Sequence, residues 1–440
     1  MLDFIRIACA VPEVKVGDVK KNVQDICAYI VKADAQNADI VLFPELAMTG
    51  YTCGDLFFQD SLHAAAKAGL KQIIACSSEH PSVMIVVGMP LRLGVKLFNC
   101  AAVISAGMLH SFVPKTHLTP AEKRWFSPAA DKRIWAYPQD LDLDEETCCA
   151  PSLYADHLFR TAENTIVGIE ICEDGMVPQP RCASLAVAGA EVILNLSASH
   201  DLAGKRSYRR ELVKHQSAAC NCIYAFASAG YTESTSDLIF SGHSIIAENG
   251  DILAESEARP TTDYMLVMDC DLGRIRADRA RSQNYNSDME LAISEQDALR
   301  SDGTLYPIRK LPFIPSSKDA RIERCFEIFQ MQVTGLKQRL KTINANAVLG
   351  ISGGLDSTLA LLVAVEAMRQ LGRPATDVYG VTMPCFGTSD RTYSNSWELM
   401  RNLGINAKEI SIKNAVTLHF EDIGHDMSVH NGTFENSQAR

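Results

Sequence analysis

The stretch GISGGLDST, residues 350–358, follows an apolar run at 347–351 and precedes a helix-compatible segment at 358–368. A strand, a glycine turn and a helix N-terminus in this order favour a pyrophosphate site. Glycine lets backbone N–H groups approach an anion, and the helix start adds partial positive charge. Asp356 suits such a site only where a divalent cation lies between carboxylate and phosphate, as Mg²⁺ does with ATP. The stretch therefore predicts an α/β domain that binds Mg-ATP.

This loop differs from the common phosphate-binding loop because it lacks the lysine of GxxxxGK[ST]. Ser352 and Ser357 can donate hydroxyl hydrogen bonds. One alternative is a glycine turn between strand and helix that binds no ligand. Six matching residues in the strand-turn-helix context favour the nucleotide site instead. The loop resembles that of the N-type ATP pyrophosphatases, which cleave ATP between the α and β phosphates.

The bulk composition is that of a globular protein with small-molecule substrates. The 440 residues are 47% hydrophobic and 22% charged, which predicts two or three domains. A net charge of −11 disfavours binding to nucleic acid. The first expected strand begins almost at the first residue, and no apolar run reaches the roughly 18 residues of a membrane span. The 14 cysteines show no metal-ligand spacing, so we expect reduced thiols and a cytoplasmic protein.

The first 270 residues alternate short apolar runs with longer amphipathic stretches, which predicts an α/β or layered α-β-β-α domain. Paired runs near 83–105 and 239–270, with Glu248-Asn249-Gly250-Asp251 as a turn, indicate hairpins and so a mixed sheet. The expected strands are residues 5–11, 40–43, 83–89, 101–105, 165–171, 192–196, 222–227, 244–247 and 265–270.

The pattern then changes to a charge-rich and turn-rich segment that contains Pro307, Pro312 and Pro315. From 319 to 343, apolar residues recur at helical spacing and lead into the strand at 347–351. We therefore expect a first domain at 1–272, a linker at 273–318 and a second domain at 319–440.

Three segments of the first domain place a reactive residue at the end of an apolar run, where an α/β sheet builds its site. They are VLFPE ending at Glu45, FVPK ending at Lys115, and GIEICED around Cys172. Taken singly, each residue has an ordinary explanation as a surface charge or a buried filler. Their occurrence together, in this order and context, indicates a catalytic set.

The set resembles the Glu-Lys-Cys triad of the nitrilase superfamily, which hydrolyses amides through a thioester on cysteine. The resemblance implies that Glu45 is the general base for Cys172, because the thiolate is the nucleophile. It also implies that Lys115 and a backbone N–H near Glu173 stabilise the oxyanion, a contact worth on the order of 3 kcal/mol. Glu122 lies where that family places a second carboxylate.

The two parts together resemble the family of glutamine-dependent NAD synthetases along the whole chain. The phrases that carry the resemblance are FPELAMTGY at 43–51, VPKTHL at 113–118, EKRWF at 122–126, GIEICED at 168–174, NLSAS at 195–199, GISGGLDST at 350–358, VTMPCFGTSDRTY at 381–393 and ENSQAR at 435–440. The implied fold is a four-layer α-β-β-α nitrilase-like sandwich, followed by part of a doubly wound parallel α/β domain of the adenine nucleotide alpha hydrolase type.

The implied reaction uses two sites. Glutamine is hydrolysed in the first domain, and its ammonia passes through a protein tunnel to deamido-NAD that ATP has adenylated, giving NAD, AMP, pyrophosphate and glutamate. ATP and Mg²⁺ would enter as a substrate complex, with no tightly bound cofactor and with Asp356 near the Mg²⁺. Nitrilase-like domains commonly pair, so the resemblance also implies a homo-oligomer.

The resemblance assigns further binding residues by position. Ser199 and Lys205 match contacts to glutamine, and Asn436 falls where deamido-NAD is contacted. A tyrosine that often covers the glutamine is missing from the short loop 119–121. The residues implied for ATP are Gly350, Ile351, Ser352, Gly353, Gly354, Leu355, Asp356, Ser357 and, near adenine, Met383.

Family members continue for well over a hundred residues beyond the position of Arg440, with a further ATP- and metal-binding segment. We therefore expect a C-terminally truncated synthetase domain and a chain that retains the glutaminase half. The alternatives are a stand-alone amide hydrolase with a non-catalytic C-terminal segment, and a binding protein without turnover. The complete Glu45, Lys115 and Cys172 set argues against the last.

Overall fold

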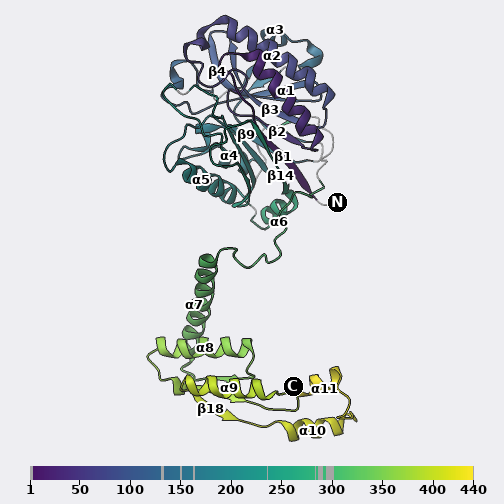
Figure 1. Cartoon of the computed structure of the whole chain (residues 1–440), viewed down its shortest axis with the longest axis vertical. Helices are drawn as coiled ribbons and strands as arrows, with labels where there is room; N and C mark the ends of the chain where they lie inside the picture. The colour runs from purple at the N-terminus through teal and green to yellow at the C-terminus, as the bar shows by residue number, and fades with distance from the viewer. Residues whose placement is uncertain are drawn as a thin grey trace. The chain divides into compact units, whose positions relative to one another are not determined.

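A computed structural model describes residues 3–129, 133–148, 151–161, 164–234, 236–282, 284–285, 291–293 and 302–439. The chain divides into two compact units, Met1–Ile308 and Arg309–Arg440. Each unit has its own hydrophobic core and its own sheets, so each is described by itself (Figure 1).

Within its described residues, the first unit contains two mixed sheets. One has eight strands in the order β14-β1-β2-β3-β4-β5-β7-β6. The other has seven, in the order β13-β12-β11-β10-β9-β8-β15. The strands of the first sheet are β1 (Phe4–Val11), β2 (Ile40–Leu42), β3 (Met84–Leu93), β4 (Lys96–Ser105), β5 (Met108–Pro114), β6 (Ile134–Trp135), β7 (Ser152–Leu153) and β14 (Tyr264–Asp271). Those of the second are β8 (Leu158–Arg160), β9 (Ile166–Ile171), β10 (Val192–Ser197), β11 (Ile223–Ser228), β12 (Ser244–Glu248), β13 (Asp251–Glu255) and β15 (Leu291–Ile293).

Helices cover the outer face of each sheet, as Figure 1 shows for α1 and α2 on one side and α4 and α5 on the other. The α-helices of this unit are α1 (Val19–Ala35), α2 (Asp60–Glu79), α3 (Pro138–Leu141), α4 (Arg181–Val187), α5 (Lys205–Ala219) and α6 (Leu272–Ser282). Short 3-10 turns are η1 (Gly54–Phe58), η2 (Glu122–Arg124), η3 (Glu145–Thr147) and η4 (Cys172–Gly175).

Three hydrophobic cores separate the layers, and β1 shows how the sequence produces them. Successive side chains of a strand point to opposite faces of its sheet. Ile5, Ile7 and Cys9 enter the core between the two sheets, while Ala8 and Ala10 enter the core under α1 and α2. Because both faces are covered, the central strands read as apolar runs rather than alternating ones. The four-layer α-β-β-α sandwich expected from the sequence is confirmed.

The nine expected strands of this unit are all present, with ends within a few residues of the prediction. The predicted hairpins are confirmed, since β3 pairs antiparallel with β4 and β12 with β13. In the second hairpin Glu248 pairs with Asp251 across the turn, and Asn249 and Gly250 take positive φ. Such a turn matches the right-handed twist of the flanking strands.

The first unit extends past residue 272, into the segment that the sequence assigns to a linker. Arg276 on α6 pairs with Glu191 and Asp3, and Arg279 donates to the carbonyls of Ala190 and Cys220. These long-range contacts fasten α6 to residues that lie just before β1 of the first sheet and just before β10 and β11 of the second. Its arginine-rich composition resembles that of a linker, because the partners of the arginines lie far away in the sequence.

The second unit is a parallel α/β domain, as expected. Its three-stranded sheet has the order β16-β17-β18, and a helix connects each strand to the next. One core, which includes Val333, Leu361 and Met400, packs α7, α8 and α9 around the sheet. The elements are α7 (Lys318–Ile343), β16 (Ala347–Gly350), α8 (Leu355–Gln370), η5 (Ala375–Asp377), β17 (Val378–Thr382), α9 (Asp390–Asn402), β18 (Asn406–Glu409), α10 (Lys413–Asp422) and α11 (Gly432–Ala439). Among the described residues, none of the helices in either unit is both long and apolar enough to cross a membrane.

His157 is a buried histidine whose protonation we expect to destabilise the first unit at acid pH. Its Nδ1 lies 2.7 Å from the Ser111 Oγ, and burial, with a smaller effect of Arg133, lowers its pKa from 6.5 to about 3. The unfolded chain therefore binds this proton more readily. The stability contributed by His157 is complete above pH 6.5 and falls as the pH drops toward 3, by about 2 kcal/mol at pH 5. Urea unfolding of wild type and His157→Asn, near neutral pH and at about pH 5, checks this. The variant should show a smaller pH dependence, and an equal pH dependence in both proteins would contradict the prediction.

Candidate active site

The ends of strands from both sheets carry three of the four expected catalytic residues, and the fourth, Glu122, lies on η2. Glu45 follows β2, Lys115 follows β5 directly, and Cys172 follows β9. The Glu45 N–H donates to the Ser197 carbonyl at the end of β10, which joins the two sheets at this point (3.3 Å). Residues far apart in the sequence therefore meet at one edge of the sandwich.

Lys115 is a fully buried cation held between two carboxylates. Its Nζ lies 2.6 Å from the Glu45 Oε1 and 2.8 Å from the Glu122 Oε1, and all three side chains are at most 1% exposed. A buried charge is tolerated only when it is paired and hydrogen-bonded. The geometry therefore groups Glu45, Lys115 and Glu122 as the sequence predicts.

Asn99 on β4 completes this group, and the sequence reasoning missed it. Its Nδ2 donates to the Glu45 Oε1 (2.7 Å) and the Glu122 Oε1 (3.1 Å), and its backbone carbonyl accepts from the backbone N–H of Lys115 (2.8 Å). The one sign of its importance in the sequence is that it is a polar residue inside an otherwise apolar run. The Glu45 Oε2, by contrast, is buried without a hydrogen-bond partner among the described residues, which leaves this oxygen able to accept a proton.

Burial and the shared lysine set the pKa values of the two carboxyls apart. Burial raises the pKa of Glu45 to about 7, against the opposing attraction of Lys115. Burial also acts on Glu122, but Lys115 and hydrogen bonds from Thr119 outweigh it and hold the pKa of Glu122 below its ordinary value. Although burial opposes it, the pKa of Lys115 is raised, above all by the negative charge of Glu45. Glu45 is therefore the carboxylate poised to exchange a proton near neutral pH.

Cys172 sits in a strained turn at the end of β9. Its φ is +47°, a conformation that non-glycine residues adopt rarely, and its Sγ accepts a hydrogen bond from the Ser197 Oγ (3.2 Å). Burial and then the charge of Glu45 raise the pKa of the thiol to about 12. The thiol thus remains protonated until a base removes its proton.

Asp174 fastens this turn to the segment that carries Lys115. Its Oδ1 accepts from the backbone N–H groups of Thr116 (3.0 Å) and His117 (2.7 Å), and its Oδ2 accepts from the N–H of Ile171 (3.3 Å). The nucleophile turn and the lysine are therefore held in a fixed relation by one buried carboxylate.

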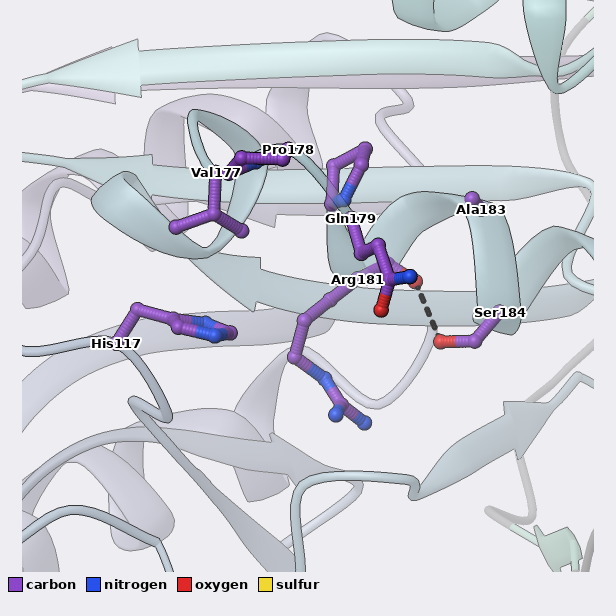
Figure 2. A pocket seen from close by; sticks show the side chains of 8 residues that line it. His117, Val177, Pro178, Gln179, Arg181, Ala183 and Ser184 are labelled. Atoms are coloured by element: carbon purple, nitrogen blue, oxygen red, sulfur yellow. Dashed lines mark hydrogen bonds between the residues drawn. The ribbon is translucent and has the colours of Figure 1, made fainter.

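A cavity of about 830 Å³ lies beside this turn, on the side of α4. Figure 2 shows the side chains of His117 and Arg181 near each other in this cavity. The Ser184 hydroxyl donates a hydrogen bond to the backbone carbonyl of Arg181 (2.9 Å). The other lining residues are Val177, Pro178, Gln179, Pro180 and Ala183.

The two residues expected to bind glutamine lie after β10. Ser199 is buried, and its Oγ is 3.4 Å from the Nη1 of Arg209, a buried arginine that also pairs with Asp201 (3.0 Å). Lys205 begins α5. The sequence offers no reason to single out Arg209, because a charged residue on an exposed-looking helix is ordinarily solvated.

Tyr51 is a third residue, after Asn99 and Arg209, that the sequence left without a role. Its ring packs edge-on against Phe240 (5.8 Å), and burial, with the charges of Glu45 and Glu122, raises the pKa of its hydroxyl. A tyrosine therefore lies near the carboxylates, although the loop 119–121 contains none.

In the second unit the glycine loop has the geometry expected of an anion site. Gly353 has a φ of +83°, and a Cβ there would lie 2.2 Å from the Thr392 carbonyl, so only glycine fits. Gly354 precedes the first residue of α8, and its N–H reaches the Ser352 Oγ at 3.3 Å. The Ser352 and Ser357 hydroxyls are 3.2 Å apart at the helix start.

A cavity of about 620 Å³ lies at this loop and is lined by Gly353, Gly354 and Arg391 among others. A second cavity of the same unit, of about 400 Å³, is lined by Met383, Ser437 and Gln438 among others. Met383 follows β17, and its Cε lies 3.3 Å from the position of a Cβ on Gly350. Asp356, on the first turn of α8, and Asn436, on α11, are both exposed. The structure thus brings Met383 to the loop, while Asn436 lies on the helix that borders the second cavity.

The sandwich and the buried Glu-Lys-Cys group define a class of amide-cleaving enzymes, and the chain belongs to the carbon-nitrogen hydrolase family, which matches residues 6–280. Residues 328–440 match the NAD synthase family. The chain is 34% identical to the glutamine-dependent NAD(+) synthetase of Mycobacterium leprae and 35% identical to that of Mycobacterium tuberculosis H37Rv, in each case over 99% of this chain. It spans 66% of the length of these relatives.

Solved structures show the same fold. A glutamine-dependent NAD+ synthetase from Acinetobacter baumannii in complex with ADP is 21% identical, with a TM-score of 0.50 over 99% of this chain and 70% of that one. The corresponding enzyme from Cytophaga hutchinsonii is 20% identical, with a TM-score of 0.52 over 99% and 71%. A Nesterenkonia amidase of the nitrilase superfamily is 19% identical, with a TM-score of 0.50 over 64% of this chain and 98% of its own.

We expect the reactivity of Cys172 to follow the protonation of Glu45. Below a pH of about 7 the Glu45 carboxyl is protonated and cannot accept the thiol proton, so alkylation by iodoacetamide should slow as the pH falls through this value. Alkylation rates of Cys172, measured by mass spectrometry across this range, report the inflection. Glu45→Gln should abolish it and lower the rate near neutral pH at least about tenfold. A wild-type inflection only near 9, the ordinary thiol value, would contradict the assignment.

Proposed function

We propose that this chain hydrolyses glutamine at Cys172 and that the ammonia amidates deamido-NAD, which ATP adenylates at the glycine loop of the second unit. The proposal makes the chain part of a glutamine-dependent NAD(+) synthetase. The observation that carries it is the buried Lys115 shared by Glu45 and Glu122 beside Cys172. A lysine with this environment serves no packing purpose that an apolar residue would not serve better.

The first half of the glutaminase reaction is acyl transfer to the thiol. The Oε2 of Glu45 accepts the Cys172 proton, and the Sγ attacks the carboxamide carbon of glutamine. The oxyanion that forms is stabilised by the Lys115 ammonium, a fixed charge that costs no reorganisation because the protein already holds it in place. Glu45 then returns the proton to the leaving nitrogen, the C–N bond breaks, and ammonia departs while the oxyanion collapses to a thioester on Cys172.

The second half is hydrolysis of the thioester. Glu45 accepts a proton from water, whose oxygen attacks the acyl carbon. The C–S bond then breaks, glutamate is released, and Glu45 returns the proton to the departing sulfur to restore the thiol. Hydrogen bonds from Asn99 and to Glu122 hold the side chains of Lys115 and Glu45 in place through both halves of the reaction. Because Glu122 takes one side of the lysine, the ammonium stays charged while Glu45 gains and loses its proton.

Ammonia must meet an activated carboxyl, because a carboxylate is a poor electrophile. In the proposed second reaction the nicotinate carboxylate of deamido-NAD attacks the α-phosphorus of ATP and expels pyrophosphate. Ammonia then attacks the acyl-adenylate and expels AMP, which gives NAD. The backbone of 350–357 and the hydroxyls of Ser352 and Ser357 would bind the phosphates, with Asp356 near the Mg²⁺ and Met383 near adenine.

The match of residues 328–440 to the NAD synthase family and the ADP-bound relative support a nucleotide at this loop. Ser199 and Lys205 remain the proposed glutamine contacts, and Asn436 the proposed contact to deamido-NAD. The cavity at the loop and the one lined by Met383 are large enough for parts of such a ligand.

Removing the nucleophile tests the first reaction. Cys172→Ala should lower glutamate release from glutamine by roughly a thousandfold or more, because no thioester can form. Glutamate is measured by a coupled dehydrogenase assay, and circular dichroism checks that the fold persists. Cys270→Ala, at a buried cysteine on β14, is the matched control and should retain most activity. Unchanged glutamate release in Cys172→Ala would remove the assignment.

The nucleotide site is tested at Gly353. An added Cβ meets the Thr392 carbonyl at 2.2 Å and forces a left-handed residue, which alone costs roughly 1–2 kcal/mol. Gly353→Ala should therefore weaken Mg-ATP binding at least tenfold in titration calorimetry.

Gly404→Ala is the matched control for this test. Gly404 has a similar φ of +65° in the same unit, but nothing lies within 4 Å of its added Cβ. We expect it to keep the affinity for Mg-ATP within about twofold, because it repeats the backbone strain away from the loop. Equal affinities of Gly353→Ala and the wild type would contradict an ATP site at this loop.

A further inference from the structure

A group of buried polar side chains lies under the nucleophile turn and takes no part in the mechanism above. It consists of Glu170, Asn195, Gln216 and Tyr224, called here the support network. Each is at most 6% exposed. They come from β9, β10, α5 and β11, so four elements of the fold meet at this place.

Glu170 is the centre of the support network. It stands two residues before Cys172 on β9 and points to the helix side of the sheet, because Ile169 and Ile171 enter the core between the sheets. Its Oε2 accepts from the N–H of Cys182 at the start of α4 (2.8 Å). Its Oε1 accepts from the Asn195 Nδ2 (3.1 Å) and from the Tyr224 hydroxyl. A single carboxylate thus joins three elements around the turn.

The nucleophile turn rests directly on these atoms. A Cβ on Gly175, the last residue of the turn, would lie 2.6 Å from the Glu170 Oε1, 2.9 Å from the Tyr224 hydroxyl and 3.0 Å from the Asn195 Nδ2. The backbone of the turn therefore packs against the polar groups without an intervening side chain. The Gly175 carbonyl also accepts from the Gln216 Nε2 (3.2 Å).

The turn is consequently held at both ends. Asp174 fastens one end to Thr116 and His117, next to Lys115. At the other end, Gln216 of the support network donates to the Gly175 carbonyl. Between these attachments Cys172 keeps a φ of +47°. A residue persists in such a conformation only when its surroundings determine it.

We infer that Glu170 is a positioning residue for Cys172, which acts through Gly175 to hold the nucleophile turn in the conformation that aims the thiol at Glu45. The inference deepens the proposed function and rests on it for the hydrolysis readout. The hydrogen bonds of Glu170 within the described part of the chain go to Cys182, Asn195 and Tyr224, and not to the thiol or the proposed glutamine contacts. We therefore expect its effect on the chemical steps and not on substrate binding.

The buried charge of Glu170 lowers the stability of the fold, which argues that the carboxylate has a functional role. Burial raises its pKa to about 7 even though Tyr224 and Asn195 donate to it. A glutamine at this position would avoid the cost of a buried charge. Its amide NH₂ group, however, would face at least one of the three donors, and two donors cannot form a hydrogen bond with each other. The carboxylate is the group that accepts from all of them at once.

The test is Glu170→Gln, with Tyr224→Phe as a milder variant that keeps the ring and removes one donor. We expect each to lower kcat for glutamine hydrolysis, Glu170→Gln about tenfold and Tyr224→Phe several-fold, with KM within twofold of wild type. Because the Tyr224 hydroxyl acts through its hydrogen bond to Glu170, the double variant should be no slower than Glu170→Gln alone, a non-additive result.

Glu248→Gln is the matched control. Glu248 is a buried carboxylate on β12 of the same sheet, and it likewise accepts from a backbone N–H, that of Asp271 (2.7 Å), and from a tyrosine hydroxyl, that of Tyr306 (3.0 Å). Its loss should affect stability in a similar way and leave kcat unchanged. A fall in kcat that Glu248→Gln shares would assign the effect to general destabilisation and overturn the inference.

Alkylation of Cys172 by iodoacetamide separates this inference from the proposed function, since it needs no glutamine. Glu170→Gln should slow alkylation several-fold, whatever amide the enzyme hydrolyses. An alkylation rate equal to that of wild type would overturn the inference even if glutamine is the substrate. A slower rate in a chain that does not hydrolyse glutamine would support the inference and contradict the proposed function.

Discussion

The buried ammonium of Lys115 is the constraint on which the first unit depends. A cation without access to water must be neutralised within hydrogen-bond distance, so the carboxylates of Glu45 and Glu122 both have to lie next to the Lys115 ammonium. This requirement fixes the end of β2 against the end of β5. It also determines the course of the segment 116–122, where the Thr119 N–H donates to the second oxygen of Glu122 (2.7 Å). Asn99 then joins the two carboxylates from β4.

The reacting thiol comes from the other sheet, and the contacts between the sheets give it its place. The apolar core between them sets their separation, while the bond from the Glu45 N–H to the Ser197 carbonyl and the bonds from Thr116 and His117 to Asp174 set their register at this edge. Apolar packing alone permits small sliding movements of one sheet over the other. Directional hydrogen bonds between specific atoms remove that freedom where the chemistry requires it.

The sequence predicts the fold well because its strands are buried on both faces and read as unmistakable apolar runs, as at 192–196 and 223–227. It misses short strands such as β7 and β8, whose few residues carry no periodicity. Glu45, Lys115 and Cys172 are predictable because each follows such a run. Asn99, Glu170 and Arg209 are not, since their importance lies in partners that only the folded chain brings near. The same reason hides α6, whose arginines resemble those of a linker until Glu191 and Asp3 are seen beside them.

The left-handed backbone of Cys172 has a thermodynamic consequence for the whole molecule. Glycine in that place would relax the turn and make the folded state more stable, yet it would remove the sulfur. The fold therefore gives up part of its stability permanently to keep one side chain aimed. Among the substitutions that raise the melting temperature of this domain, we therefore expect several that also abolish the reactivity of Cys172.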